Sequence, residues 1–247
     1  RVFRGAERYI GSDGAPVESE AVRDLILRVH KSQEPIYVAA IGAVTNIASA
    51  ILVDPSIVDN MVVVWLGGNA LGFGQGVEFN LIQDLRAAQT IFNSGVPLIW
   101  IPCLNVASLL SVSECELREY LLHTTPIGDY LARTVLNAFS DPQSDIAFMK
   151  LNRSSSLREN SDEDDGYLAQ FPTEKVAWSR IIWDIATIAV LKNPNWLPSK
   201  LIPSPVLNDD YTWEATASNR HLIRMATHCY RNMVFGDLFE ALTKPER

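Results

Sequence analysis

The sequence predicts an α/β protein built on an open, mostly parallel sheet flanked by helices. Continuous apolar runs of strand length lie at 36–41, 62–66 and 97–101. Such runs are typical of strands that are buried on both faces of a parallel sheet. Segments with helical periodicity separate the runs, and the connections are short. Three successive strand–helix steps of this kind indicate right-handed crossovers within one sheet.

The helices of the first half follow from periodicity and from their stop signals. A helix over 19–30 has apolar residues at helical spacing. A second helix opens at Thr45 and stops before Pro55, because the residue before a proline disfavours the helical conformation. A third covers 84–93 and ends at Gly95.

The second half of the chain is predicted to be helical. The segment 153–173 contains the acidic run Asp162 to Asp165 and is predicted to be a mobile, solvated loop, with metal binding by the run as the alternative. The predicted helices cover 113–122, 126–139, an apolar stretch at 177–191, and one or two terminal helices within 219–244.

Composition limits the class of protein. The 247 residues, 47% of them hydrophobic, are enough for one sizeable core, so we expect a single domain over 1–247. A net charge of -8 argues against a nucleic-acid partner, which would need a basic face. No apolar run approaches the length of a membrane span. Three cysteines, an odd number, fit a reducing compartment better than a disulfide framework, so we expect a cytoplasmic protein.

Polar residues follow the strand at 62–66. Gly67 and Gly68 allow a sharp turn at its carboxyl end, and a glycine-rich loop then leads to Glu78, Phe79 and Asn80. Open α/β sheets bind ligands outside the carboxyl ends of their strands. A carboxylate and an amide at that edge suit a polyhydroxylated ligand. The alternative is that Glu78 and Asn80 merely cap the following helix.

Two more residues point to the same edge. A strand–glycine–helix transition places Thr45 beside the carboxyl edge that carries Glu78. Asp184 lies among isoleucines in the apolar stretch at 177–191. We predict that Asp184 is buried, and a buried carboxylate needs a cation or several donors.

Several motifs, in this order along the chain, resemble the inosine–uridine preferring nucleoside hydrolase family. They are Arg4-Gly5-Ala6, the run Ala40 to Ala48, Gly67-Gly68, Glu78-Phe79-Asn80 with Asp84 and Ala87-Ala88, Ser94 to Pro97, and Trp183-Asp184.

The resemblance implies the family's fold, with an open Rossmann-like sheet, and an N-ribohydrolase of purine salvage. Such an enzyme uses water to cleave the bond between a nucleobase and ribose, with Ca²⁺ organising the ribose and the water. Carried over to this chain, Thr45 would give its backbone carbonyl and Asp184 its carboxylate to Ca²⁺. Glu78 and Asn80 would bind the ribose hydroxyls, and Phe79 would shape the wall. Family members are usually homodimers or homotetramers, so we expect one of these assemblies.

The first departure from the family is the missing amino-terminal acidic cluster. That cluster supplies further calcium carboxylates and the general-base Asp, and no such run precedes Arg4. We therefore expect that the first strand–helix portion is missing and that the 247 residues alone do not hydrolyse nucleosides. The alternative is a catalytically inactive nucleoside hydrolase-like binding or subunit protein.

Two smaller departures concern the substrate. Trp183 stands where many members carry His as an acid, and it predicts stacking on a purine base; plain core packing is the alternative. The Gly-Asn element expected before the Glu is also missing. Gln75 and Asn69 are the candidates for the amide that binds the ribose 5′-hydroxyl.

Overall fold

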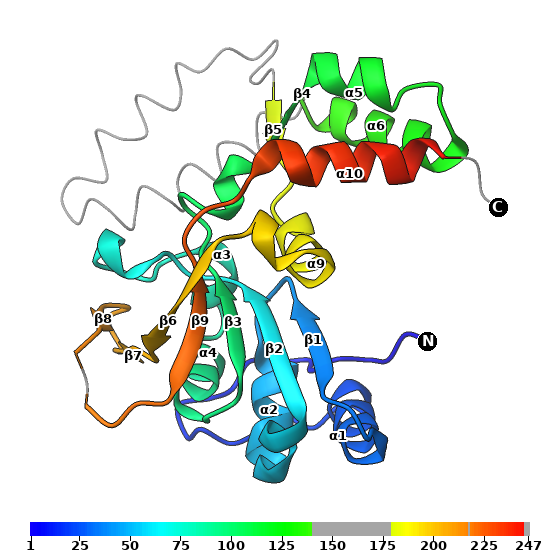
Figure 1. Cartoon of the computed structure of the whole chain (residues 1–247). Coiled ribbons are helices and arrows are strands. Elements are labelled where there is room, and N and C mark those ends of the chain that lie inside the picture. Colours follow the sequence, from blue (N-terminus) through cyan, green and yellow to red (C-terminus); the bar gives the residue numbers. More distant parts are fainter. Residues whose placement is uncertain (140–178, 217, 245–247) are drawn as a thin grey trace, which may run out of the picture. The chain divides into compact units, whose positions relative to one another are not determined.

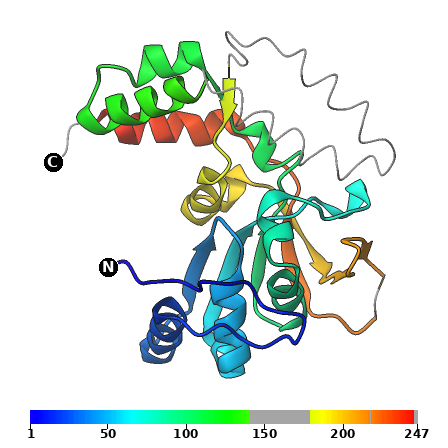
Figure 2. The same cartoon turned by 180° about the vertical axis from the view of Figure 1, so that it is seen from behind.

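The computed structural model describes residues 1–139, 179–216 and 218–244, which fall into two compact units. The first unit combines Arg1–Ala107 with Asp184–His228, and the second combines Ser108–Trp183 with Cys229–Arg247. Each unit is described by itself (Figures 1 and 2). The predicted loop at 153–173 lies outside the described residues.

Within the described residues, the first unit is built on a five-stranded sheet. The strand order is β1-β2-β3-β9-β6, and all neighbours are parallel except β6, which runs antiparallel to β9. The predicted α/β class with a mostly parallel sheet is therefore confirmed. The strands are β1 (Ile36–Ala40), β2 (Met61–Leu66), β3 (Leu98–Ile101), β9 (Leu222–Ala226) and β6 (Ser199–Pro203).

Three helices pack on one face of this sheet (Figure 2). They are α1 (Glu20–Lys31), α2 (Thr45–Val53) and α4 (Leu85–Asn93), close to the predicted bounds. Alternate strand residues such as Val63, Trp65 and Trp100 are fully buried in the core beneath them. A fourth helix, α9 (Ile185–Lys192), contacts β1 and β2. The unit also contains α3 (Phe79–Gln83) and the 3-10 helices η1 (Pro55–Asn60), η2 (Leu71–Phe73) and η4 (Pro194–Trp196).

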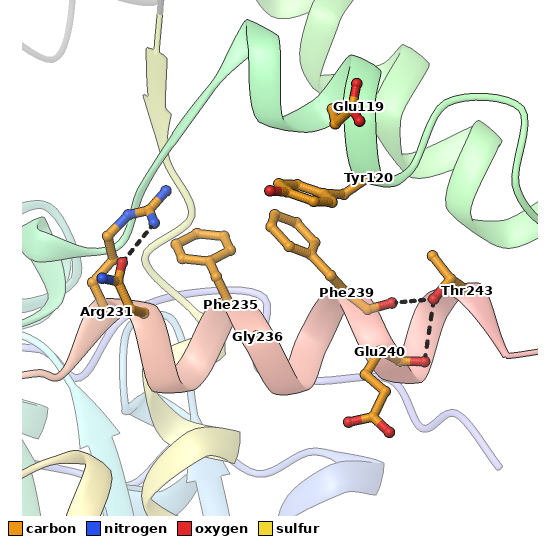
Figure 3. A pocket seen from close by; sticks show the side chains of 9 residues that line it. Glu119, Tyr120, Arg231, Phe235, Gly236, Phe239, Glu240 and Thr243 are labelled. Atoms are coloured by element: carbon orange, nitrogen blue, oxygen red, sulfur yellow. Dashed lines mark hydrogen bonds between the residues drawn. The ribbon is translucent and has the colours of Figure 1, made fainter.

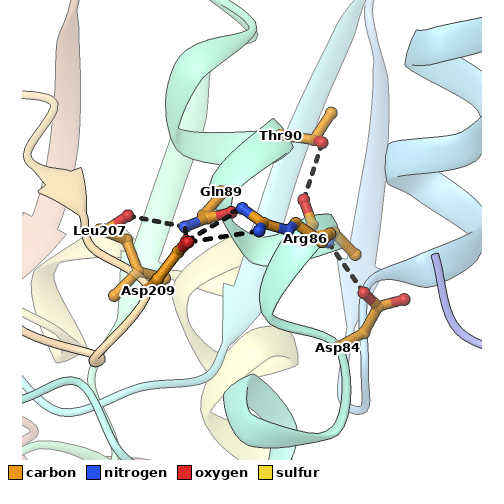
Figure 4. Close-up of polar contacts among 7 residues, drawn as sticks. Asp84, Arg86, Gln89, Thr90, Leu207 and Asp209 are labelled. Carbon is orange, nitrogen blue, oxygen red and sulfur yellow. Dashed lines mark hydrogen bonds and ion pairs between the residues drawn. The ribbon is translucent and has the colours of Figure 1, made fainter. Parts of the chain in front are cut away.

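A small hairpin is attached to the outer side of α4. Its strands are β7 (Val206–Leu207) and β8 (Trp213–Glu214). Figure 4 shows the attachment: Arg86 forms an ion pair with Asp209 at 2.9 Å, and Gln89 Nε2 donates to the Leu207 carbonyl at 3.0 Å. The hairpin is thereby held by side chains of α4, and its Trp213 also packs against Trp100 of β3 with ring centroids 5.1 Å apart.

The second unit contains three described helices and a short sheet. Its strands β4 (Ser111–Ser113) and β5 (Ser179–Ile181) are antiparallel, and its helices are α5 (Glu114–Tyr120), α6 (Pro126–Ala138) and α10 (Arg231–Thr243). The 3-10 helix η3 (Ala107–Leu109) lies where the chain passes between the units. Tyr120 of α5 stacks on Phe239 of α10 with ring centroids 5.1 Å apart (Figure 3).

Two predicted elements, and the burial of a third, were wrong. The stretch at 177–191 is not one helix, because 179–181 forms β5 and α9 begins only at Ile185. Residues 222–226, predicted as helix, form β9 between β3 and β6, with Ile223 and Met225 buried and Arg224 exposed. The second half is thus not purely helical. The strand at 36–41 is not buried on both faces, because Tyr37 is 56% exposed on an edge strand.

No helix among the described residues combines the length and apolar character that a membrane crossing would need.

Arg231 is the main polar link between α10 and the start of α5. Its guanidinium donates to both Glu116 carboxylate oxygens, at 2.5 and 2.7 Å, and its Nε donates to the Ser111 carbonyl at 2.7 Å. Burial alone would raise the pKa of Glu116, but hydrogen bonds from Arg231 and Ser113 outweigh it and lower the pKa.

We expect Arg231→Met to lower the free energy of unfolding by about 1–3 kcal/mol, because Oε1 of the partly buried Glu116 and the Ser111 carbonyl lose the donors that Arg231 supplies. Chemical denaturation of the full chain measures this. The control is Arg118→Met, which removes an exposed helix pair with Glu114 and should cost less than about 0.5 kcal/mol. Equal losses of unfolding free energy in both variants would show that the bonds of Arg231 contribute no more to stability than an exposed ion pair.

Candidate functional site at the carboxyl edge of the sheet

The turn after β2 has room only for glycines. A Cβ at Gly67 would come within 2.3 Å of the Trp65 ring. Gly68 has φ +69°, a left-handed conformation that favours glycine, and a Cβ there would meet Leu81 at 2.8 Å. The turn is held from the next strand, because Trp100 Nε1 donates to the Gly67 carbonyl at 2.7 Å and the Cys103 N–H donates to the Gly68 carbonyl at 2.9 Å.

Glu78 is buried and anchored by this turn. Its Oε2 accepts the N–H groups of Gly68 (2.8 Å), Asn80 (3.0 Å) and Leu81 (3.3 Å), so that Glu78 caps α3. Within the described residues, Oε1 receives no hydrogen bond. Glu78 thus caps α3, which was the alternative prediction for this residue. The cap uses only one carboxylate oxygen and leaves the other available.

The environment of Glu78 disfavours its charge. Burial is the largest effect and raises the pKa of its carboxyl; the three N–H bonds oppose this, and the negative charge of Asp184 adds to the increase. Asp184 therefore lies close enough to Glu78 to interact with it electrostatically.

Asp184 stands at the residue before α9, in a helical conformation, and its carboxylate caps nothing. The prediction that it is buried inside a helix was wrong: the residue is exposed at the helix start. Neighbouring atoms still desolvate the carboxylate in part and raise its pKa. An oxygen ligand that is accessible and lacks a capping bond is available to a bound group.

Asn80 and Phe79 occupy the first turn of α3. Asn80 is buried, and its Nδ2 donates to the carbonyl of Leu66, the last residue of β2, at 2.9 Å. It therefore braces the strand end and does not cap the helix. Phe79 is 59% exposed, so its ring is free to form the wall of a binding site.

Thr45 is the first residue of α2 and is buried. Its hydroxyl donates to Asp84 Oδ2 at 2.6 Å, so the side-chain oxygen is used within the protein. Asp84 itself caps α4, as its position in Figure 4 shows. The sequence reasoning missed the link that Asp84 makes to Ile10 and Thr45, because both lie far away along the chain.

The two amides suggested for the 5′-hydroxyl differ in their surroundings. Asn69 Nδ2 donates to the Val77 carbonyl at 2.7 Å, and its Oδ1 accepts the Leu104 N–H at 3.2 Å. Both ends of the Asn69 amide therefore brace the loop. Gln75 is half-buried and pairs with Thr212 through an isolated β-bridge. Because this bridge uses the backbone and not the side-chain amide, Gln75 is the better candidate for the 5′-hydroxyl.

Trp183 is half-buried and belongs to the second unit. Its predicted stacking on a base stays a prediction.

Cys103 is a further residue that sequence reasoning missed. It follows β3, is buried, and its thiol pKa is raised strongly, first by burial and then by the charges of Glu78 and Asp184. The thiol is therefore neutral at physiological pH and is not a nucleophile. Its position directly after Pro102, at the carboxyl end of a predicted strand, could have placed it near the site. Glu78, Asp184 and Cys103 together mark an acidic region of the first unit.

Within the part of the chain that the structure describes, no three His, Cys, Asp or Glu side chains are grouped so that they could hold a metal ion. Ca²⁺ takes six to eight oxygen ligands, several of them carboxylates. Asp184 and the Thr45 carbonyl are hard oxygen donors of the required type. The described residues do not complete such a shell.

The comparison with known families decides the relationship. The sequence model of the inosine-uridine preferring nucleoside hydrolases matches residues 4–228. The chain belongs to this family.

Relatives with known names or structures show how far the likeness extends. The pyrimidine-specific ribonucleoside hydrolase RihA of Shewanella woodyi is 33% identical over 121 residues, or 48% of this chain and 38% of that protein. The plant nucleoside hydrolase PpNRh1 has a TM-score of 0.67 at 18% identity, covering 98% of this chain and 76% of that one. A purine-preferring ribonucleoside hydrolase from Gardnerella vaginalis has a TM-score of 0.65 at 19% identity, covering 92% and 66%.

These two structures support the nucleoside hydrolase fold of the chain. The chain spans about two fifths of the length of the curated relatives that it matches.

The raised pKa of Glu78 predicts a pH dependence of stability. In the folded protein its carboxyl keeps a proton above the ordinary value of 4.5, so the folded state binds more protons than the unfolded state. The stability that Glu78 contributes is fully present below that ordinary value and is lost as pH rises through the folded pKa. We expect the free energy of unfolding of Glu78→Gln, relative to wild type, to increase between pH 4.5 and pH 8.

Chemical denaturation with chelator present measures this difference at both pH values. The exposed Glu34→Gln serves as control and should show no such change. A difference for Glu78→Gln that is constant with pH would show that burial does not perturb this carboxyl.

Proposed function

We propose that this chain carries the ribose-holding part of a nucleoside N-ribohydrolase, which hydrolyses the N-glycosidic bond of ribonucleosides to free base and ribose. The observation that carries the proposal is Glu78, fixed by three backbone N–H groups with its second oxygen available. Family membership over residues 4–228 supports the same reaction class. Cytoplasmic location and a homodimer or homotetramer belong to the proposal as well.

The chemistry follows from charge. Cleavage of the bond builds positive charge on the ribose ring, so the site has to stabilise an oxocarbenium-like state. Glu78 Oε1 accepts a ribose hydroxyl, and the rigid backbone bonds on Oε2 keep the carboxylate oriented. Asn80 holds the end of β2 in place and has a second amide proton and its Oδ1 for the ribose. Phe79 forms the wall beside the sugar.

Ca²⁺ is the proposed cofactor. Asp184 and the Thr45 carbonyl would hold it, and the ion would supply a positive charge that orients ribose hydroxyls and lowers the pKa of bound water. A cation near Asp184 would also offset the negative charge that raises the pKa of Glu78. The remaining ligands and the general base have to come from residues other than these.

A second candidate is a non-catalytic nucleoside hydrolase-like protein that binds a ribosylated ligand or a partner subunit. The observation in its favour is that the described residues contain no cluster of three metal-ligating side chains. The two candidates differ in turnover: the first releases free base from a nucleoside, and the second binds without releasing it.

We expect the full-length gene product that contains this chain to release reducing sugar from inosine or uridine, and a chelator to abolish the release. Asp184→Ala should lower kcat/KM by about 10²-fold or more, because it removes a charge that acts on the reacting centre. A reducing-sugar assay with a nucleoside panel measures both effects. The matched control is the exposed Asp59→Ala, which should leave activity unchanged. Undiminished activity of Asp184→Ala would refute the site.

Base preference is the finer part of the proposal. The matched Shewanella relative is named pyrimidine-specific and the Gardnerella structure is named purine-preferring. The names of the relatives therefore do not agree on one base preference. We propose a purine preference, because stacking of a base on Trp183 would favour the larger ring. Trp183→Ala should lower kcat/KM for inosine more than for uridine by about 10-fold, since stacking contributes about 1–3 kcal/mol per base. Equal losses for both nucleosides would remove the stacking role.

A further inference from the structure

Asp84 joins three segments of the first unit at one buried point. Its Oδ1 accepts the Ala87 N–H at 2.9 Å, which caps α4. Its Oδ2 accepts the Ile10 N–H at 3.0 Å and the Thr45 hydroxyl at 2.6 Å. The side chain is 3% exposed and both oxygens are used, so Asp84 has no free oxygen directed at a ligand. Its role is therefore to fix other groups in place.

One of these groups is the N-terminal strap, residues 4–10. Asn46, the neighbour of Thr45, accepts the Ala6 N–H on Oδ1 at 2.8 Å and the Ser19 hydroxyl on the same atom at 3.1 Å. At the other end of the strap, the Tyr9 hydroxyl donates to Gln83 Oε1 at 3.1 Å. The strap is thus tied to the first turn of α2 and to the residues just before α4.

The start of α2 needs such an anchor. The residue before it is Val44, which offers no side-chain cap for the first N–H groups of the helix. Helix ends without caps fray, and a frayed first turn would let the Thr45 backbone move. The bond from the Thr45 hydroxyl to Asp84 holds this turn from the side.

We propose that Asp84 is a positioning residue: through the Thr45 hydroxyl it fixes the first turn of α2, and thereby the Thr45 carbonyl, in the orientation that binds the metal ion. This inference rests on the proposed function, which assigns that carbonyl to Ca²⁺. The strap shares the same carboxylate, so order in residues 4–10 and metal affinity are coupled through Asp84.

The test is calorimetric titration of the full-length protein with Ca²⁺, combined with the Tm of each variant in chelator. Thr45→Val keeps the shape of the side chain and removes its hydroxyl, while Thr45→Ser keeps the hydroxyl. We expect Thr45→Val to raise the Kd for Ca²⁺ at least 10-fold and Thr45→Ser to restore it to within about 2-fold of wild type, since partners that orient ligands contribute about 10–100-fold in affinity.

The matched control is Ser49→Ala on the same helix. Ser49 is fully buried, and its Oγ accepts the Val17 N–H at 3.0 Å, so it also ties the amino-terminal region to α2 but faces no predicted ligand. This variant should lower the Tm and leave the Kd for Ca²⁺ unchanged. If the Thr45 hydroxyl only stabilised the fold, Thr45→Val would likewise lower the Tm and leave the Kd for Ca²⁺ unchanged.

Four outcomes overturn the inference. Thr45→Val that binds Ca²⁺ like wild type would show that the hydroxyl does not position the carbonyl. Equal loss of affinity in Ser49→Ala would show general loosening of α2. Wild-type protein that binds no Ca²⁺ would remove the metal assignment and this inference together. Hydrolysis of inosine that needs Ca²⁺ and is unaltered in Thr45→Val would overturn the inference and leave the proposed function standing.

Discussion

The turn at Gly67 and Gly68 is the constraint on which the site depends. The Trp65 ring and Leu81 fill the space in which side chains at these positions would lie, so core packing dictates the path of the backbone. That path directs the Gly68 N–H at Glu78 Oε2. The packing of the sheet and the placement of the Glu78 carboxylate therefore depend on each other. A substitution in the core beneath β2 would shift the turn and, with it, the carboxylate.

Two buried carboxylates beside the sheet, Glu78 and Asp84, differ in how their oxygens are hydrogen-bonded. Glu78 gathers its three donors on one oxygen and keeps the other available. Asp84 receives three donors on both oxygens and is fully used within the protein. The first arrangement suits recognition of a hydroxyl, and the second suits fixing of the backbone. Burial alone would not have distinguished them.

Local signals explain which parts of the fold were predictable. The strands β1 to β3 and the helices α1, α2 and α4 follow from apolar runs, caps and stop signals within a few residues of each element. The strand β9 was missed because its pairing with β3 and β6 lies in distant segments, and Arg224 interrupts its apolar pattern. Asp184 was wrongly placed inside a helix, since Ile181 before it ends β5, Ile182 lies in the connection, and only the isoleucines after it belong to α9.

Ionisation of the carboxyl groups at the carboxyl edge of the sheet is disfavoured, and this bears on the kind of ligand that would suit the edge. Burial and the neighbouring Asp184 both oppose ionisation of Glu78, and Asp184 is itself partly desolvated. An uncharged ligand would leave these penalties in place and an anionic ligand would increase them, whereas a cation, or a sugar ring that gains positive charge, would relieve them. Because relief grows with the positive charge, the edge suits a group that gains positive charge better than a neutral one.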